Sequence, residues 1–577
     1  MAESPPSRRY GFHLARSALV LWASLLPAIG ANPDQPGDPE RYLEVVRTFA
    51  DNVLERGRDV YGEKPTPLFA DGLNVDTGEP VVWRFDGEEW IISNFASQQN
   101  LMRTLVGLTN LSGDDRYRGA AEAAARHMFD YQSSECGLLY WGGHQIVDLR
   151  TQENIGHFDA DCHELKVNLP YYSFLWEVDP EATRRMLEAI WNAHILDWEV
   201  LDMNRHGEFG LETGRLWDHD FDRPEPFFEG RGLTFINTGT DLIHAGGMLH
   251  ALGGDEGALT WTRRLAEQYV RARHPETGLG VYQYSRPERR EEPPQEGPLD
   301  GRLTWSTYGD RAENQFGREF GDVAREGWVL WGGRARTIYV SNALVQLELA
   351  ERLGDDGEEL LEWTVEGMKA YFRHAYDPES NHFRPLWADG TDLTGEKISR
   401  TGYYGENGDE FQALPADTRF LFSYARAYRL SRDASLWNAL RSMGNGIGLG
   451  DFGAEPGSGV EPDLDTTVFG TDAVFALLEI ARTVDDSEPY LLLARRVADN
   501  MIERRFHDGF FLGSRARINA NFNAVEPLAL LALAAVLRET PELVPVYSGG
   551  RGYIHGRYDG YGRTYCSRAI WSVTREN

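Results

Sequence analysis

Apolar residues recur every three or four positions in segment after segment of the chain, and this spacing predicts amphipathic helices. The pattern begins at about Pro39, is clear in 40–57, 97–113 and 115–132, and continues to about residue 539. Glycine often follows the last apolar residue of a segment, where the C-cap of a helix prefers it. More than a dozen such segments favour helical hairpins wound into a ring. We therefore predict a mainly α fold, an (α/α) toroid or barrel, with the connecting loops at one mouth.

Small β arms are expected between the helices. Residues 67–78 (PLFADGLNVDTG) are echoed by 385–395 (PLWADGTDLTG), and both predict the same turn-bearing arm. The charged, proline-rich stretch 288–302 predicts a surface insertion. The glycine-, tyrosine- and arginine-rich end, 546–577, predicts either a short β-hairpin or a strap across the ring.

The first residues have the pattern of an export signal. Arginines precede an apolar run at 18–26, and small residues offer a cleavage site before residue 32. The run is far shorter than the roughly 20 residues that cross a bilayer, so we expect an exported protein, periplasmic or secreted, without a membrane partner. A disordered cytosolic tail is the alternative. The predicted domains are the signal 1–31, a linker 32–39, the toroid 40–545 and the tail 546–577.

The formal net charge of −32 argues against nucleic acids and anionic membranes as partners. An acidic substrate would then need a local basic cleft in an acidic body. The three cysteines are too few for a disulfide framework. A bridge between Cys136 and Cys162 is conceivable in an exported protein, but we favour buried free thiols. The sequence does not indicate an oligomeric state.

Three candidate metal ligands lie between residues 136 and 210, namely His144, Glu164 and His206. Two imidazoles and a carboxylate can bind a divalent cation and leave positions open for a substrate. Arg205 precedes the last of them, and an arginine beside a cation indicates an anionic ligand such as a carboxylated substrate. Spacing alone leaves the alternative of hydrogen-bonded structural histidines, because the same region also holds His157, His163, His194 and His219.

Longer strings in this region resemble a known family. CGLLYWGGHQIVDL, HELKVNLPYY, ATRRMLEAIWNAHILDW and NRHGEFG are similar to polysaccharide lyase family 2, the pectate lyases with an (α/α)7 toroid. The similarity continues through RAENQFGREFG and TGYYGENGDEF and covers about residues 60 to 540. The resemblance implies that His144, Glu164 and His206 bind a transition metal, usually manganese, and that Arg205 is the Brønsted base. The ligand types alone also admit cobalt, nickel or zinc.

The reaction expected from this resemblance is β-elimination in α-1,4-linked galacturonan (polygalacturonate), giving 4,5-unsaturated oligogalacturonides. A divalent cation on the uronate carboxylate would act as a Lewis acid when the weakly acidic C5 proton leaves. A guanidinium has a pKa above about 12 in water, which a nearby cation would lower, so an alkaline optimum is expected. Clamping of the uronate is the alternative role of Arg205. Lys166 is the alternative base or a substrate ligand, and otherwise a surface charge.

Further substrate contacts are predicted on either side of the insertion. Guanidinium groups bind carboxylates through paired hydrogen bonds, and Arg334 and Arg336 stand in a glycine-flexed turn at the start of a helix. Arg271 could act in the same way or complement the dipole of its helix C-terminus. Trp141 and Tyr339 could stack on sugar rings, as could Tyr403, with core packing as the alternative for each.

Other functions stay open at this point. A lyase for another uronate polymer, such as alginate or ulvan, would need the same groups. A glycoside hydrolase or sugar epimerase could use a similar ring, and hydrolysis needs a carboxylate pair, for which Glu164 with Asp202 or Glu208 is available. A non-catalytic oligogalacturonide-binding protein is the third alternative. A chelator would separate metal-assisted elimination from hydrolysis by carboxylates.

Overall fold

The computed structural model describes most of the chain after the predicted signal and linker. The described residues are 38–85, 88–143, 145–156, 162–165, 167–292, 307–550, 555–558, 564–566 and 568–575. The expected export signal, His144, His157, Lys166 and part of the insertion at 288–302 lie outside them. Within the described residues, no helix has the length and apolar character needed to cross a membrane.

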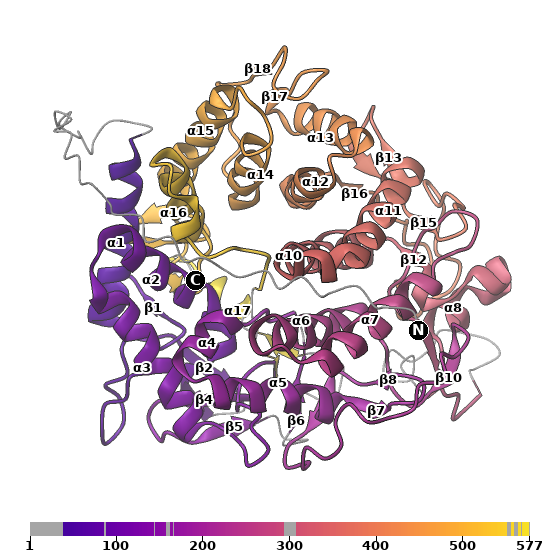
Figure 1. Cartoon of the computed structure of the whole chain (residues 1–577), viewed down its shortest axis with the longest axis horizontal. Helices are drawn as coiled ribbons and strands as arrows, with labels where there is room; N and C mark the ends of the chain where they lie inside the picture. The colour runs from indigo at the N-terminus through magenta and orange to yellow at the C-terminus, as the bar shows by residue number, and fades with distance from the viewer. Residues whose placement is uncertain are drawn as a thin grey trace, which may run out of the picture.

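Helical hairpins form a closed double ring in the described part of the chain, with an outer helix followed by an inner one in each hairpin (Figure 1). The inner helices of the second to seventh hairpins pack on one another in chain order, and the inner helix of the seventh packs on that of the first to close the ring. This confirms the predicted (α/α) toroid. The seven pairs are α1 (Pro39–Arg56) and α2 (Gln99–Ser112), α3 (Asp115–Tyr131) and α4 (Tyr172–Val178), α5 (Pro180–His194) and α6 (Ile236–Gly253), α7 (Glu256–Arg271) and α10 (Ala343–Leu353), α11 (Glu358–Ala375) and α12 (Thr418–Ser431), α13 (Ala434–Ile447) and α14 (Thr471–Ala481), and α15 (Glu488–Arg505) and α16 (Glu526–Leu537).

The two layers differ in sequence because they differ in burial. The inner helix α16, EPLALLALAAVL, is apolar on nearly every side, whereas the outer helix α1 buries one stripe that includes Tyr42, Val46 and Phe49. Aspartates cap the N-termini of five outer helices through a side-chain oxygen that accepts a backbone N–H, each worth about 1 kcal/mol. These caps are Asp38, Asp114, Asp179, Asp255 and Asp433.

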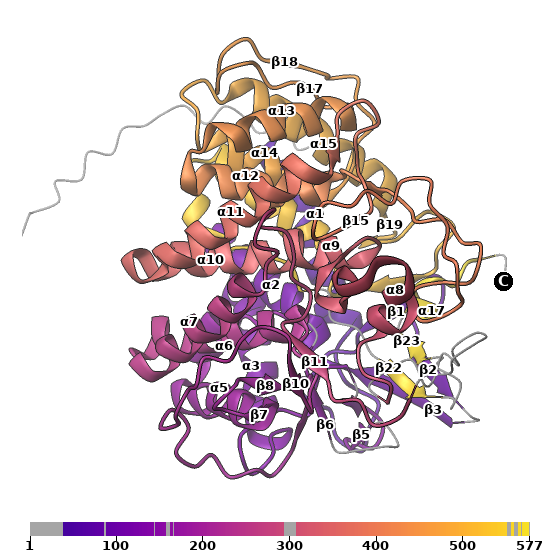
Figure 2. The ribbon, with the colours of Figure 1, turned by 90° about the vertical axis from the view of Figure 1, so that its right-hand side faces the viewer.

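The links between helices are short at one end of the ring and long at the other. An inner helix passes to the next outer helix in a few residues, as at 113–114 and 254–255, whereas 132–171 and 195–235 lead from outer to inner helices. The long links carry the strands, most of which lie on one side of the helices in Figure 2, while α7 and α10 project on the other. This confirms the predicted mouth of connecting loops.

The strands are short and form several small sheets. The largest joins β2 (Val82–Phe85), β3 (Glu88–Ser93), β4 (Gln145–Asp148) and β5 (Asn154–Gly156), all antiparallel. The other pairs are β1 (Gly72–Asn74) with β21 (Asn519–Asn521), β6 (Cys162–Glu164) with β9 (His206–Glu208), β7 (Ile195–Asp197) with β8 (Asp202–Met203), β10 (Phe228–Gly230) with β11 (Ser285–Pro287), β12 (Val329–Leu330) with β15 (Leu386–Trp387), β14 (His382–Phe383) with both β13 (Tyr376–Asp377) and β16 (Leu414–Pro415), β17 (Gly450–Asp451) with β18 (Glu461–Pro462), and β19 (Phe506–His507) with β20 (Phe510–Phe511).

Each of the two echoed sequences forms a short strand and a turn, but the strands occupy different positions within the echo. One contains β1 and the other β15, and each ends in a glycine with a left-handed backbone, Gly78 at φ 76° and Gly395 at φ 80°. Two shorter helices, α8 (Arg311–Phe320) and α9 (Gly333–Arg336), lie in the long link between α7 and α10, and the four-residue α17 (Arg568–Trp571) lies near the C-terminus.

A segment near the C-terminus crosses the opening of the ring. The Tyr547 ring stacks on Phe475 of α14 and Phe422 of α12, with centroids 4.8 and 6.2 Å away. The Arg426 guanidinium of α12 donates to Tyr547 O at 2.9 Å, and Asn100 of α2 donates to Gly550 O at 2.6 Å. Residues 544–550 therefore form the strap that the sequence predicted as one alternative. Farther on, β22 (His555–Tyr558) pairs antiparallel with β23 (Thr564–Cys566).

Candidate active site

Two strands from consecutive long links bring three of the predicted site residues together. Glu164 at the end of β6 lies opposite His206 at the start of β9, and Leu165 N–H donates to Arg205 O at 2.9 Å. Side chains of directly opposed residues in an antiparallel pair lie on the same face, with Cβ atoms about 5 Å apart. Glu164 Oε1 is 3.6 Å from His206 Nε2 and 3.5 Å from Arg205 Nε. The fourth predicted residue, His144, lies outside the described residues.

A pair of glycines covers the Glu164 carboxylate. Gly142 forms an isolated bridge with Glu164, and a Cβ on Gly143 would lie 1.6 Å from Glu164 Oε2. Asn94 fixes this turn, because its side chain donates to Gly142 O at 2.8 Å and accepts from Gly142 N–H at 3.1 Å. The carboxylate is therefore fully buried beneath backbone that has no room for a side chain at position 143.

The separation of the two described candidate ligands is compatible with a shared metal ion. Ligand atoms about 2.1 Å from one cation are separated by about 3.0 to 3.6 Å for ligand angles of about 90 to 120°, and Glu164 Oε1 and His206 Nε2 lie within that range. Mixed nitrogen and oxygen donors suit a divalent transition metal. No group of three potential ligands occurs among the described residues, and the expected third ligand, His144, is not among them.

Arg205 lies against both potential ligands. Its Nε donates to His206 Nε2 at 3.2 Å, and its side chain is 20% exposed. The guanidinium therefore contacts both candidate ligands and keeps part of its surface open to solvent. The sequence predicted Arg205 for this place because it directly precedes His206.

Three other histidines of this region, His163, His194 and His219, have protein partners, and His157 lies outside the described residues. His163 Nδ1 lies 2.8 Å from His194 Nε2, and His194 Nδ1 lies 2.8 Å from Asn204 O. Burial lowers the pKa of the His194 imidazole to about 4 and that of His163 well below its usual value. Both rings are therefore neutral at physiological pH. His219 stacks on Trp198, with centroids 4.7 Å apart.

Trp141 belongs to this buried group and not to a sugar-stacking surface. Its indole N–H donates to His163 Nε2 at 3.1 Å, its ring stacks on Phe95 at 5.9 Å, and it is 2% exposed. The expectation that Trp141 contacts substrate is corrected, because its polar atom and its ring face both have protein partners. Core packing, the alternative, is what the structure shows.

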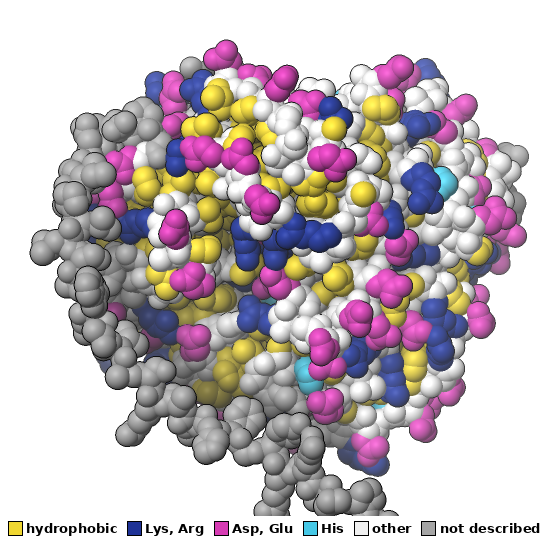
Figure 3. Space-filling model, turned by 45° about the horizontal axis from the view of Figure 1, so that its top comes forward, with side chains coloured by type: hydrophobic (Ala, Val, Ile, Leu, Met, Phe, Trp, Pro, Cys, Tyr) yellow, Lys and Arg dark blue, Asp and Glu magenta, His cyan; other side chains and the backbone are white. Residues whose placement is uncertain are grey.

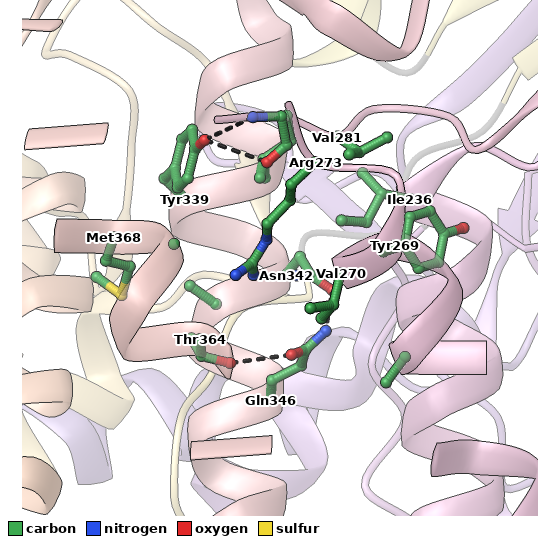
Figure 4. A pocket seen from close by; sticks show the side chains of 15 residues that line it. Ile236, Tyr269, Val270, Arg273, Val281, Tyr339, Asn342, Gln346, Thr364 and Met368 are labelled. Atoms are coloured by element: carbon green, nitrogen blue, oxygen red, sulfur yellow. Dashed lines mark hydrogen bonds between the residues drawn. The ribbon is translucent and has the colours of Figure 1, made fainter. Parts of the chain in front are cut away.

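Tyr339 is also a core residue (Figure 4). It stacks on Tyr371 at 4.0 Å, and its hydroxyl lies 3.2 Å from both the N–H and the carbonyl oxygen of Gly280. It lines a cavity of about 30 Å³ between α7, α10 and α11, which has room for little more than water. The expectation that Tyr339 stacks on a sugar is corrected for the same reason as for Trp141.

The predicted subsite arginines have protein partners. Arg334 Nη2 lies 3.3 Å from Glu326 Oε1, and Arg336 Nη2 lies 3.1 Å from Asp417 Oδ2. Arg271 donates to Pro224 O and Gln268 Oε1 at 2.9 Å. These contacts tie the end of α7 to a neighbouring loop, and a subsite role for Arg271 stays a prediction.

Sequence reasoning missed the carboxylate that organises this arginine region. Glu326 is fully buried and pairs with Arg311 as well as Arg334, and its N–H donates to the carboxylate of Asp310. Burial, with the Glu326 charge nearby, raises the pKa of the Asp310 carboxyl to about 6. Tyr403 lies over the Arg311 guanidinium at 3.8 Å and is 38% exposed, so it is the more accessible of the three predicted stacking rings.

Two further expectations concern cysteines and charge. Cys136 and Cys162 are both partly exposed, so the favoured interpretation of buried thiols is corrected for these two residues. The alternative carboxylate Asp202 stabilises a loop, because its oxygens accept hydrogen bonds from the backbone N–H groups of Arg231 and Gly232.

Acidic and basic side chains are interspersed over the face shown in Figure 3, so the negative charge there is not gathered into one patch.

Comparison with known proteins places this chain in a family. A sequence model of the family described as periplasmic pectate lyase matches residues 66–557. The chain belongs to this family. The pectate disaccharide-lyase of Dickeya dadantii (strain 3937) is 36% identical over 529 residues, which cover 90% of this chain and 93% of that protein. The protein is therefore a polysaccharide lyase with an acidic polysaccharide as its class of substrate, as the resemblance implied.

Solved structures give a weaker likeness. A D-mannose isomerase is 11% identical, with a TM-score of 0.39 over 72% of this chain and 88% of that one. The GH76A α-1,6-mannanase of Salegentibacter sp. HEL1_6 is 10% identical, with a TM-score of 0.34 over 86% of this chain and 99% of that one. Scores this low support no inference about chemistry.

Proposed function

We propose that this pectate lyase cleaves α-1,4-linked galacturonan by metal-assisted β-elimination and leaves a 4,5-unsaturated end on the product. The observation that supports this most directly is the grouping of Glu164, His206 and Arg205 within 3.2 to 3.6 Å of one another at the loop mouth of the ring. A carboxylate, an imidazole and a guanidinium in contact provide metal ligands and a base in one place.

Glu164 and His206 would hold the divalent cation together with His144. Bound there, such a cation supplies Lewis-acid stabilisation of the charge that develops on the uronate carboxylate. The burial of Glu164 under Gly143 fixes one ligand before substrate arrives, so little reorganisation is needed. Manganese is the metal that the resemblance favours.

Arg205 would take the C5 proton of the uronate. The electron pair of the C5–H bond forms the C4–C5 double bond, the C4–O4 bond breaks, and the leaving oxygen receives a proton from solvent. A general base must be deprotonated before it can accept a proton. The rate is therefore expected to increase toward alkaline pH.

We also propose that the product is an unsaturated disaccharide and that the enzyme acts after export. The first proposal is supported by the name of the Dickeya dadantii relative, a pectate disaccharide-lyase, with which this chain shares nearly its full length. The second is supported by the family description, periplasmic pectate lyase, and by the apolar run that follows the N-terminal arginines.

The test is the ultraviolet absorbance of the unsaturated product during incubation with polygalacturonate. We expect a rise with Mn²⁺, no rise with a chelator, and recovery when metal is added back. Arg205→Lys should abolish most turnover, whereas Arg215→Lys, at a surface arginine that is 80% exposed, should not change it. New reducing ends without absorbance would show hydrolysis and refute elimination. Chromatography of early products distinguishes disaccharide release from internal cleavage.

A further inference from the structure

The backbone on both sides of Arg205 is held by hydrogen bonds. His194 binds residue 204 twice, because Asn204 N–H donates to His194 O at 3.0 Å and the His194 ring contacts Asn204 O at 2.8 Å. On the other side, Arg205 O accepts from Leu165 N–H at 2.9 Å, and His206 N–H donates to Asn204 Oδ1 at 3.2 Å. Both peptide groups that flank the Arg205 Cα are therefore fixed.

The hydrogen bonds that lead to Asn204 can have only one direction. The Trp141 indole N–H can only donate, so His163 Nε2 accepts, and Asn204 O can only accept, so His194 Nδ1 carries a proton. Because His163 Nε2 accepts, the ring proton of His163 is on Nδ1, which donates to His194 Nε2. This assignment follows from the partners at the two ends of the series. Each imidazole thus has a single tautomer and a single orientation.

Packing leaves the His194 ring no other position. A Cβ on Gly207 would lie 2.7 to 2.9 Å from three atoms of that ring, so the strand β9 passes directly over it. Gly207 pairs with His163 across the β6–β9 ladder, and both histidines are almost completely buried. The ring is therefore clamped between the end of α5 and the strand that carries His206.

We propose that His194, oriented by Trp141 and His163, is a positioning residue that sets the backbone of Arg205 and hence the direction of its guanidinium toward Glu164. The inference rests on the proposed role of Arg205 as the base. His194 touches neither substrate nor metal in this scheme and acts only through residue 204. Partners of this kind, one contact removed from the reacting groups, typically change activity by about 10- to 100-fold when lost.

The experiment compares His194→Asn with His194→Leu in the full-length enzyme with saturating Mn²⁺. Asparagine places an N–H near the position of Nδ1 and can still donate to Asn204 O, whereas leucine cannot. We expect His194→Leu to lower kcat by about 10- to 100-fold with little change in KM, and His194→Asn to recover most of this loss. Equal kcat values for the two variants would overturn the proposal.

A second readout does not depend on turnover. Amide hydrogen exchange of the peptide covering residues 204–208 should be faster in His194→Leu than in His194→Asn, in metal-free protein at a temperature where both variants are folded. Unchanged exchange in both variants would overturn the proposal. If His194→Leu does not fold, His163→Asn and His163→Leu give the same comparison one hydrogen bond farther from Asn204. A higher kcat and slower exchange in His163→Asn would support the proposal, and equal values in the two variants would overturn it.

The Arg205→Lys background separates this inference from the proposed function. If His194 acts through Arg205, His194→Leu should add little further loss to Arg205→Lys. A full additional loss would overturn the positioning role. If Arg205→Lys alone keeps wild-type kcat, the proposed base is wrong, while the exchange comparison still reports whether His194 holds residues 204–208.

Discussion

Replacing Gly143 by alanine would place a methyl group inside the Glu164 carboxylate. The Cβ would lie 1.6 Å from Glu164 Oε2 and 2.7 Å from Cδ, whereas real Cβ atoms keep at least 3.0 Å from such neighbours. Either the carboxylate or the turn must therefore move by more than about 1 Å. Asn94 forms hydrogen bonds to both the N–H and the carbonyl oxygen of Gly142, and Glu164 is fully buried, so either movement disturbs existing contacts.

The size of the effect follows from what Glu164 touches. Its Oε1 lies 3.5 Å from Arg205 Nε and 3.6 Å from His206 Nε2, so a shift of 1 Å changes both separations by a large fraction. A misplacement of that size in a catalytic group can cost about 100-fold in rate, equivalent to about 2.7 kcal/mol of transition-state stabilisation. We expect kcat/KM for polygalacturonate to fall by about 100-fold in Gly143→Ala, and Mn²⁺ affinity to fall by about 10-fold or more.

The assay is product absorbance at saturating Mn²⁺, together with calorimetric titration of Mn²⁺ into metal-free protein. Gly119→Ala is the matched control, because Gly119 is exposed in α3 and its Cβ would meet nothing within 4 Å. That variant should keep wild-type activity and gain about 0.5 to 1 kcal/mol in stability. Wild-type kcat/KM and Mn²⁺ affinity in folded Gly143→Ala would refute the argument that the glycine pair positions Glu164.

Three further changes probe stability. Burial raises the pKa of the Asp71 carboxyl from 3.8 to about 7. The stability contributed by the protonated carboxyl is therefore complete below the pKa of the unfolded chain and is lost as the pH rises through 7. Asp71→Asn should raise the Tm near pH 9 and change it little near pH 4. Glu326→Gln leaves Arg311 and Arg334 without their buried carboxylate and should cost about 3 to 5 kcal/mol in urea unfolding, whereas Asp218→Asn, in an exposed pair, should cost less than about 1 kcal/mol. Tyr547→Ala should lower stability by about 3 to 5 kcal/mol in the same measurement; an unchanged unfolding midpoint would show that the strap does not stabilise the ring.

The ring could be predicted from the sequence because each hairpin carries its own local signals. The apolar spacing, the glycines after helices and the aspartates before them occur within a few residues of the elements that they define. The strap could be predicted only as one of two alternatives. Its partners, such as Phe475 and Asn100, are far from it in the sequence, and nothing local identifies them.

The candidate site could be predicted only with the help of the family resemblance. Glu164 and His206 meet only because two three-residue strands pair in one register, and strands this short have no periodicity to read. Burial could not be read from residue type either, so Trp141 and Tyr339 were expected at the substrate and lie in the core. The Gly142–Gly143 pair was visible, but the reason for it is the carboxylate beneath it, which belongs to Glu164, 21 positions after Gly143.

The closure of the ring between α16 and α1 has a consequence for synthesis. The contact joins the two ends of the fold, so α1 cannot complete its packing until residues 526–537 exist. Until then the chain is an open horseshoe whose two end helices expose apolar faces, including Tyr42 and Phe49 of α1. The entropic cost of closing so long a loop rises only slowly with its length. The larger risk comes from the time that the unfinished chain spends open, because one nascent chain can then accept α1 from another. Ring closure is therefore the step at which this fold is most open to domain swapping and aggregation.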